Sequence, residues 1–172
     1  VEGYGMPESS PVALGNPFHP SRRTGTIGVP FPSTLMKVVD VEDPSKEVAQ
    51  GEPGELLVKG PQVFQGYWNN PEETAKAKTE DGWLRSGDVV TVDEDGFAQV
   101  VDRAKELIIT GGFNVSPTEV EIALRQHADV ADAAVFGKPL ARGGEMVVAA
   151  VQLEEGAGLN EDALRAHCRE LL

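Results

Sequence analysis

Short runs of apolar and β-branched residues, separated by turn signals such as Pro53-Gly54 and Asp95-Gly96, dominate the middle of the chain. This pattern predicts short strands in an antiparallel sheet or a small barrel. The predicted strands are Leu35–Val41, Glu55–Lys59, Val63–Trp68, Val89–Val92 and Phe97–Val101. The polar segment 71–79 predicts one short helix among them. Residues 1–34 are rich in Gly, Pro and Ser without a clear period, which predicts loop with short extended pieces.

The pattern changes after Arg103, where helical signals join the strands. Ser116, followed by Pro117 and by Glu119 three residues later, predicts a helix that starts with Ser116 as its N-cap and runs to about His127. The strands predicted around this helix are Leu107–Thr110, Val130–Gly137 and Glu145–Leu153.

A last helix is predicted after Asn160, whose side chain can cap it. Its inner face is expected to carry Leu164, His167 or Cys168, and Leu171. The chain as a whole therefore predicts an α+β fold: a β-rich part of distorted-barrel type over residues 1–102, followed by a small α+β domain over residues 103–172.

Composition and charge narrow the classes of function. The 172 residues carry a net charge of −13 at pH 7, and a chain this acidic repels phosphate backbones and anionic lipid surfaces, which argues against nucleic-acid binding. No apolar run approaches the ~18 residues of a membrane span. Cys168 is the only cysteine, which excludes an internal disulfide and fits a cytoplasmic location. The chain starts without Met or a signal sequence, so we expect a fragment of a longer polypeptide.

Other constellations of reactive residues do not form a convincing site. His167 and Cys168 are neighbours on the predicted helix and point in different directions, which argues against a catalytic pair. The three histidines lack metal-ligand spacing. The acidic run Asp93-Glu94-Asp95-Gly96 lacks the rest of a calcium-loop pattern, so it predicts a hairpin turn.

Four motifs follow one another in a fixed order. Residues 4–8 read Tyr-Gly-Met-Pro-Glu, and residues 54–69 read Gly-Glu-Leu-Leu-Val-Lys-Gly-Pro-Gln-Val-Phe-Gln-Gly-Tyr-Trp-Asn. Residues 83–88 read Trp-Leu-Arg-Ser-Gly-Asp, and residues 102–121 begin Asp-Arg-Ala-Lys-Glu-Leu-Ile-Ile-Thr-Gly-Gly. Together they resemble the adenylate-forming (AMP-binding) enzyme superfamily, and within it the AMP-forming acyl-CoA synthetases, of which this chain resembles the C-terminal portion.

The resemblance implies a ligase that uses ATP, Mg²⁺ and coenzyme A. A carboxylic acid, such as a fatty acid, would first form an acyl-adenylate and then an acyl-CoA thioester. Peptide-synthetase adenylation domains and luciferase-like oxygenases share the motifs, so related chemistries remain open. In this family residues 1–102 correspond to the end of the large AMP-binding domain, and residues 103–172 to the small C-terminal lid domain, cut before its end.

Two residues match the nucleotide side of the family's site. Asp88 matches the ribose-binding aspartate, and a carboxylate can accept hydrogen bonds from both ribose hydroxyls. Arg103 matches an arginine that contacts the ribose and phosphates, a role that suits a guanidinium fork. The alternatives are a turn aspartate after Gly87 and a surface ion pair between Arg103 and Asp102.

Three residues match the mobile part of the family's site. Lys105 matches the hinge about which the lid domain rotates between the two half-reactions, and a hinge needs only a residue that tolerates a large change in φ and ψ. Gly111 and Gly112 match a loop that approaches the pantetheine channel, where glycine permits close backbone approach. The alternative for both glycines is a plain turn.

The first motif places Tyr4 and Gly5 beside the adenine, continues through Met6 and Pro7 on the phosphate side, and ends at Glu8, the Mg²⁺-associated glutamate. Pro7 departs from the family, which usually has Thr there, and it offers neither a hydroxyl nor a backbone N–H. Adenylation is then weakened, compensated by the loop, or lost.

Two family elements have no match in the chain: a Gly-rich phosphate loop, expected upstream, and an adenylation lysine, expected downstream. We therefore expect the missing N-terminal portion of the same polypeptide to be the main partner, and the fragment alone to be inactive. A second hypothesis is a non-catalytic relative that acts as an interaction module. Pro7 and the absent lysine favour it, whereas Glu8, Asp88 and Arg103 together oppose it.

Overall fold

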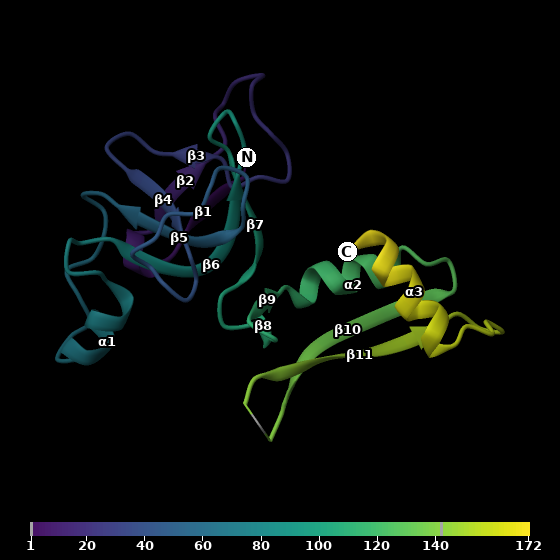
Figure 1. The fold of residues 1–172 in the computed structure, drawn as a ribbon. Helices are drawn as coiled ribbons and strands as arrows, with labels where there is room; N and C mark the ends of the chain where they lie inside the picture. Colours follow the sequence, from purple (N-terminus) through teal and green to yellow (C-terminus); the bar gives the residue numbers. More distant parts are fainter. Residues whose placement is uncertain (1, 142) are drawn as a thin grey trace. The chain divides into compact units, whose positions relative to one another are not determined.

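The computed structural model describes residues 2–141 and 143–172. The chain divides into two compact units, Val1–Ala104 and Lys105–Leu172, and each is considered by itself. The first unit is β-rich and the second mixes strands with helices (Figure 1). The expected α+β class, with a β-rich part followed by an α+β part, is confirmed.

The described part of the first unit contains two antiparallel sheets, of three and four strands. The smaller one has the order β1-β2-β3, with bounds Gly3–Gly5, Val12–Gly15 and Val29–Pro30. The larger one has the order β4-β5-β6-β7, with bounds Leu35–Val39, Gly54–Lys59, Leu84–Val92 and Ala98–Arg103. A single 3-10 turn, η1 (Pro7–Ser9), and one short helix, α1 (Pro71–Ala77), complete its described elements.

The core of this unit lies where the two sheets meet. Leu14 of β2, Leu56 and Val58 of β5, and Val90 of β6 are all fully buried and pack in one cluster. An isolated bridge between Gly28 and Ala98 links the sheets. No closed barrel forms among the described residues, which corrects the distorted-barrel expectation: β1 to β3 are too short to provide a continuous ladder around the core.

The strand predicted at Val63–Trp68 is absent from the described structure. Its apolar side chains anchor a loop instead. Val63 is buried, and the Phe64 and Tyr67 rings pack edge to face with centroids 4.8 Å apart. The backbone N–H of Tyr67 donates to Thr74 Oγ1 in the middle of α1. The backbone N–H groups of Phe64 and Tyr67 therefore have hydrogen-bond acceptors outside any strand, so the segment does not need to pair with a neighbouring strand.

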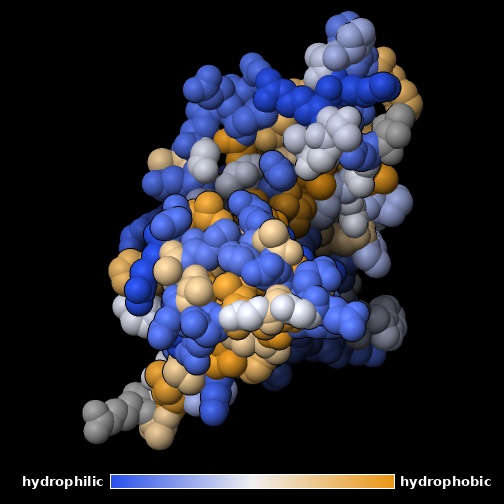
Figure 2. Space-filling model, turned by 90° about the vertical axis from the view of Figure 1, so that its right-hand side faces the viewer, coloured by the Kyte–Doolittle hydropathy of each residue, from blue (hydrophilic) through white to orange (hydrophobic). Residues whose placement is uncertain are grey.

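The second unit consists of two hairpins and two helices. Its strands are β8 (Ile108–Thr110), β9 (Phe113–Val115), β10 (Val130–Pro139) and β11 (Glu145–Leu153), and its helices are α2 (Pro117–Arg125) and α3 (Glu161–Leu171). Both strand pairs are antiparallel. On the face that Figure 2 shows, hydrophobic residues reach the surface between hydrophilic ones.

The predicted helix caps of this unit are confirmed. The Ser116 side chain accepts from the backbone N–H of Glu119 at 3.1 Å, and Asn160 accepts from that of Ala163 at 3.0 Å. Each bond satisfies a donor that the first helical turn leaves without a partner.

The inner face of α3 is confirmed only in part. Leu164 and Cys168 pack against the core formed around Ile108 and Leu124. Leu171 is 47% exposed, so its predicted place on that face is wrong. It lies at the end of the helix, past the last turn that the core covers.

Candidate functional site

The Asp88 carboxylate is the centre of a cluster in the first unit. The hydroxyl of Tyr4, on β1, donates to Asp88 Oδ2 at 2.5 Å. Arg103, at the end of β7, lies directly opposite Asp88 in the β6–β7 pairing, and its Nε is 3.8 Å from Asp88 Oδ1. The structure thus brings together three residues that the sequence predicted as nucleotide ligands. Asp88 retains acceptor capacity, since a carboxylate offers about four lone pairs.

Gly5 lies where two backbone segments come very close. A Cβ at this position would lie 1.7 Å from the carbonyl oxygen of Pro11. The β1–β2 register shifts between Tyr4 and Gly5, shortly before η1 begins at Pro7. The packing of the hairpin therefore accounts for this glycine, and its place beside an adenine stays a prediction.

Met6, Pro7 and Glu8 form the start of η1. Met6 is its extended N-cap and Pro7 its first residue, a position that tolerates proline because the N–H there would have no helical partner. The fully buried Ser9 closes the turn: its Oγ accepts from Met6 N at 3.1 Å and donates to Met6 O. Ser9 was not predicted as a site residue, although serine and proline are both residues that favour turns.

Glu8 is held by a second tyrosine. Tyr67 donates its hydroxyl to Glu8 Oε1 at 2.6 Å, and the Glu8 carbonyl accepts from Phe64 N at 2.8 Å. Mg²⁺ is usually bound through one or two carboxylates together with substrate phosphates. A single glutamate fits that donor set. Among the described residues no group of three His, Cys, Asp or Glu side chains is placed to hold a metal on its own.

The tyrosines beside these carboxylates should resist ionisation. Burial, followed by the hydrogen bond to Asp88, raises the pKa of Tyr4 well above its ordinary value, and the hydrogen bond to Glu8 raises the pKa of Tyr67. Because the folded pKa is raised, each phenol stabilises the fold fully below about pH 10. That contribution is lost as the pH rises through the raised pKa.

We therefore expect little tyrosinate absorbance from the folded chain at pH 10, where free tyrosine is about half ionised. Ultraviolet titration tests this, since the chain has two tyrosines. The Tyr67→Phe variant isolates Tyr4, and its urea-unfolded form is the control. Half-developed absorbance at pH 10 in the folded variant would contradict the Tyr4–Asp88 bond.

Lys105, Gly111 and Gly112 belong to the second unit, which starts at Lys105. Lys105 is exposed in the turn that precedes β8. Gly111 and Gly112 connect β8 to β9 with φ of 59° and 85°, the signature of a tight two-residue hairpin turn. That turn explains both glycines locally. The hinge role and the pantetheine contact stay predictions.

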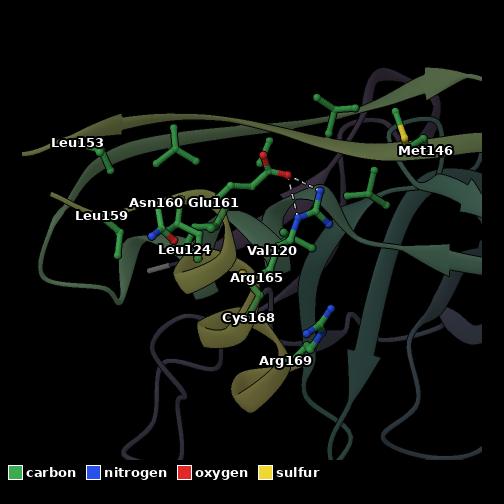
Figure 3. A pocket seen from close by; sticks show the side chains of 15 residues that line it. Val120, Leu124, Met146, Leu153, Leu159, Asn160, Glu161, Arg165, Cys168 and Arg169 are labelled. Atoms are coloured by element: carbon green, nitrogen blue, oxygen red, sulfur yellow. Dashed lines mark hydrogen bonds and ion pairs between the residues drawn. The ribbon is translucent and has the colours of Figure 1, made fainter.

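An open groove of about 660 Å³ lies in the second unit between α3, α2 and β11 (Figure 3). Its walls are mainly apolar, with Leu124, Val151 and Leu164 among the lining residues, and the Arg165–Glu161 ion pair stands at its edge. Among the described residues, none of those predicted for the nucleotide or coenzyme A site lines this groove. The groove therefore shares no residue with the Asp88 cluster.

Two family models match the chain. The AMP-binding enzyme model matches residues 1–68, and the AMP-binding enzyme C-terminal domain model matches residues 119–172. The Tyr4 motif lies in the first match, and Asp88 and Arg103 lie between the two. The chain belongs to the AMP-binding enzyme family.

Named relatives are ligases. The long-chain-fatty-acid--CoA ligase of Yersinia pestis is 45% identical over the whole chain, and the 2-succinylbenzoate--CoA ligase of Geobacillus kaustophilus is 45% identical over 98% of it. The crystal structure of ATP-bound MatB from Rhodopseudomonas palustris has a TM-score of 0.83 and 38% identity over 99% of the chain, which spans 34% of MatB. The chain spans 30% of the Yersinia ligase and 34% of the Geobacillus ligase.

Proposed function

We propose that the chain is the C-terminal part of an ATP-dependent acid–thiol ligase that converts a long-chain fatty acid into its coenzyme A thioester. The long-chain-fatty-acid--CoA ligases, matched over the full chain, support the substrate class. The alternative, a non-catalytic interaction module, is not favoured, because the relatives matched over the whole chain are named as ligases.

The proposed reaction has two steps. In the first, a carboxylate oxygen of the acid attacks the α-phosphorus of ATP, the bond to the β-phosphate oxygen breaks, and pyrophosphate leaves. In the second, the sulfur of coenzyme A attacks the acyl carbon, the bond to the AMP oxygen breaks, AMP leaves, and the thiol loses its proton. Both steps bring anions together, so catalysis depends on positioned groups that bind and neutralise the phosphates.

The observation that carries the proposal is the Tyr4–Asp88–Arg103 cluster. Asp88 would accept the ribose hydroxyls while its Oδ2 stays bonded to Tyr4. Arg103 lies opposite Asp88, its side chain is 71% exposed, and its guanidinium would contact the ribose or a phosphate. Tyr4 is protonated at neutral pH, as any tyrosine is, and its raised pKa keeps it protonated in more alkaline solution as well, so it can keep the carboxylate oriented.

The other roles complete the proposal. Glu8 would hold Mg²⁺, which neutralises phosphate charge when bound. Lys105 would act as the hinge between the two half-reactions, with Gly111 and Gly112 near the pantetheine. The rest of the polypeptide would supply the phosphate loop and the adenylation lysine. No described helix is long and apolar enough to cross a bilayer, and the cytoplasmic location stays a prediction.

Product analysis of the full-length polypeptide tests this function. With palmitate, ATP, Mg²⁺ and coenzyme A, we expect palmitoyl-CoA and AMP in equal amounts, and little product with acetate. ADP in place of AMP would contradict the adenylate route. Thioester formation only with short or aromatic acids would contradict the proposed long-chain substrate but would still support the proposed ligase activity.

Replacing Pro7 with threonine should raise the rate of adenylation. Pro7 is exposed, so the change disturbs little packing, and it adds a hydroxyl on the phosphate side. One hydrogen bond to a charged group is worth about 1.5–3 kcal/mol, so we expect an increase of at least about tenfold in kcat/KM for ATP. Pro7→Ala, which adds no hydroxyl, is the control. Equal rates in the two variants would show that the loop already compensates.

A further inference from the structure

Glu55 is a buried charge that the proposed reaction does not use. It is 2% exposed, at the start of the central strand β5. Its Oε2 accepts from Arg85 Nε at 3.0 Å and from Nη2 at 2.5 Å. Its Oε1 accepts from the backbone N–H of Gly87 at 3.2 Å. A buried carboxylate is tolerated only when it is paired in this way.

Strand β6, to which Glu55 is bonded through Arg85 and Gly87, is irregular next to Asp88. Glu55 pairs with Val89, but Leu57, two residues on, pairs with Arg85, so β6 carries extra residues at this point. Gly87 has a φ of 75°, a left-handed conformation that favours glycine. Such bulges re-aim the side chains beside them. Here the neighbouring side chain is Asp88.

The bulge is fixed from both sides. On one side, Glu55, itself paired with Arg85, accepts from the Gly87 N–H. On the other, the Gly87 carbonyl accepts from Ala104 N at 2.8 Å, just after Arg103. The backbone that carries Asp88 is thus tied at once to the buried ion pair and to the strand end that carries Arg103.

We propose that Glu55 is a positioning residue for Asp88: through Arg85 and the Gly87 amide it fixes the bulge that aims the Asp88 carboxylate at the ribose. This inference rests on the proposed function, since it assumes that Asp88 binds ribose. Glu55 touches no reacting atom; it acts through the backbone next to Asp88.

The chain contains a matched pair for comparison. Glu121 accepts from Arg125 Nη2 at 2.9 Å with Oε2, and from the backbone N–H of Val135 at 2.9 Å with Oε1. This arrangement repeats the Glu55 pattern of one arginine and one amide, but it lies in the second unit. Glu121→Gln therefore removes a similar but more exposed pair, with 22% exposure of the Glu121 side chain against 3% for Glu55, without touching the Asp88 bulge.

The test compares two ligands of the full-length polypeptide by calorimetry: AMP, and 2′,3′-dideoxy-AMP, which lacks both ribose hydroxyls. We expect the unmodified protein to bind AMP at least about tenfold more tightly than the dideoxy ligand, because charged hydrogen bonds are lost with the hydroxyls. Glu55→Gln should weaken AMP binding about tenfold, leave dideoxy-AMP within about twofold, and so abolish the preference. Glu121→Gln should keep it.

The outcomes separate this inference from the function on which it rests. If Glu55→Gln keeps the preference for AMP, or weakens both ligands equally, Glu55 is only structural and the inference is overturned while Asp88 keeps its role. If the unmodified protein shows no preference, the ribose role of Asp88 fails, and the inference with it. Arg85→Lys, which retains the charge but not the fork, provides a second variant should Glu55→Gln fail to fold, with the same predicted loss of preference.

Discussion

Replacing Asp88 with alanine should lower kcat/KM for ATP by at least about 100-fold in the full-length polypeptide. The change removes the acceptor for two ribose hydroxyls, and each charged hydrogen bond is worth about 1.5–3 kcal/mol. It also leaves the half-buried Tyr4 hydroxyl without its partner at 2.5 Å. Both losses act on nucleotide binding, so the KM for ATP should rise, whereas the KM for the acid should change little.

A surface aspartate of the same unit provides the control. Asp95 is exposed in the β6–β7 turn and pairs with Arg23, an arrangement that contributes little to stability. Asp95→Ala should therefore change kcat/KM less than twofold. Equal activity of the Asp88→Ala enzyme and the Asp95→Ala enzyme would show that Asp88 is an ordinary turn residue, the alternative that its position after Gly87 left open.

The second large effect concerns stability. Leu56→Ala should lower the free energy of unfolding of the first unit by about 3 kcal/mol, within the usual range for a buried leucine. Leu56 is fully buried and packs with Leu14, Val58 and Val90. The cavity cannot collapse easily, because β5 is hydrogen-bonded on both sides, to β4 and to β6.

Urea titration followed by tryptophan fluorescence measures this change, since both tryptophans, Trp68 and Trp83, lie in the first unit. Leu35→Ala, on the adjacent strand β4 with 59% exposure, is the control and should cost less than about 0.5 kcal/mol. Similar midpoints for the two variants would contradict the assignment of this core.

Elements with strong local signals could be predicted from the sequence. The strand Glu145–Leu153 has the predicted bounds, and Ser116 and Asn160 cap their helices as expected. The helix caps join residues that are three positions apart in the sequence, so they form independently of the tertiary arrangement. The short, β-rich apolar stretch Val63–Trp68 also predicted a strand. Its side chains anchor a loop instead, because tertiary contacts decide what an apolar segment covers.

The short hairpin strand β9, Phe113–Val115, was not predicted. Gly111-Gly112 indicated a turn, but the three residues after it carry too little periodicity to indicate a strand. The pairing of Ile108 with Val115 fixes β9, and this pairing is a property of the hairpin rather than of either segment.

The candidate site could be predicted only through its motifs. Nothing local distinguishes Asp88 from a turn aspartate, and its partner Tyr4 lies 84 positions away in the chain. The Glu55–Arg85 ion pair was not predicted. One feature of the sequence indicated it: a glutamate directly before a run of apolar strand residues is either exposed to solvent or paired with another charge. Its partner became visible only with the register of β5 and β6.

Exchange of labelled pyrophosphate into ATP tests the central claim most directly, because it reports adenylate formation without coenzyme A. The full-length polypeptide is assayed with a series of acids from acetate to palmitate. We predict exchange that depends on a long-chain acid and that is lost in the Asp88→Ala enzyme. A folded polypeptide that shows no exchange with any acid would contradict the proposed ligase activity and would indicate an inactive relative. Pro7→Thr would then be the first substitution to test.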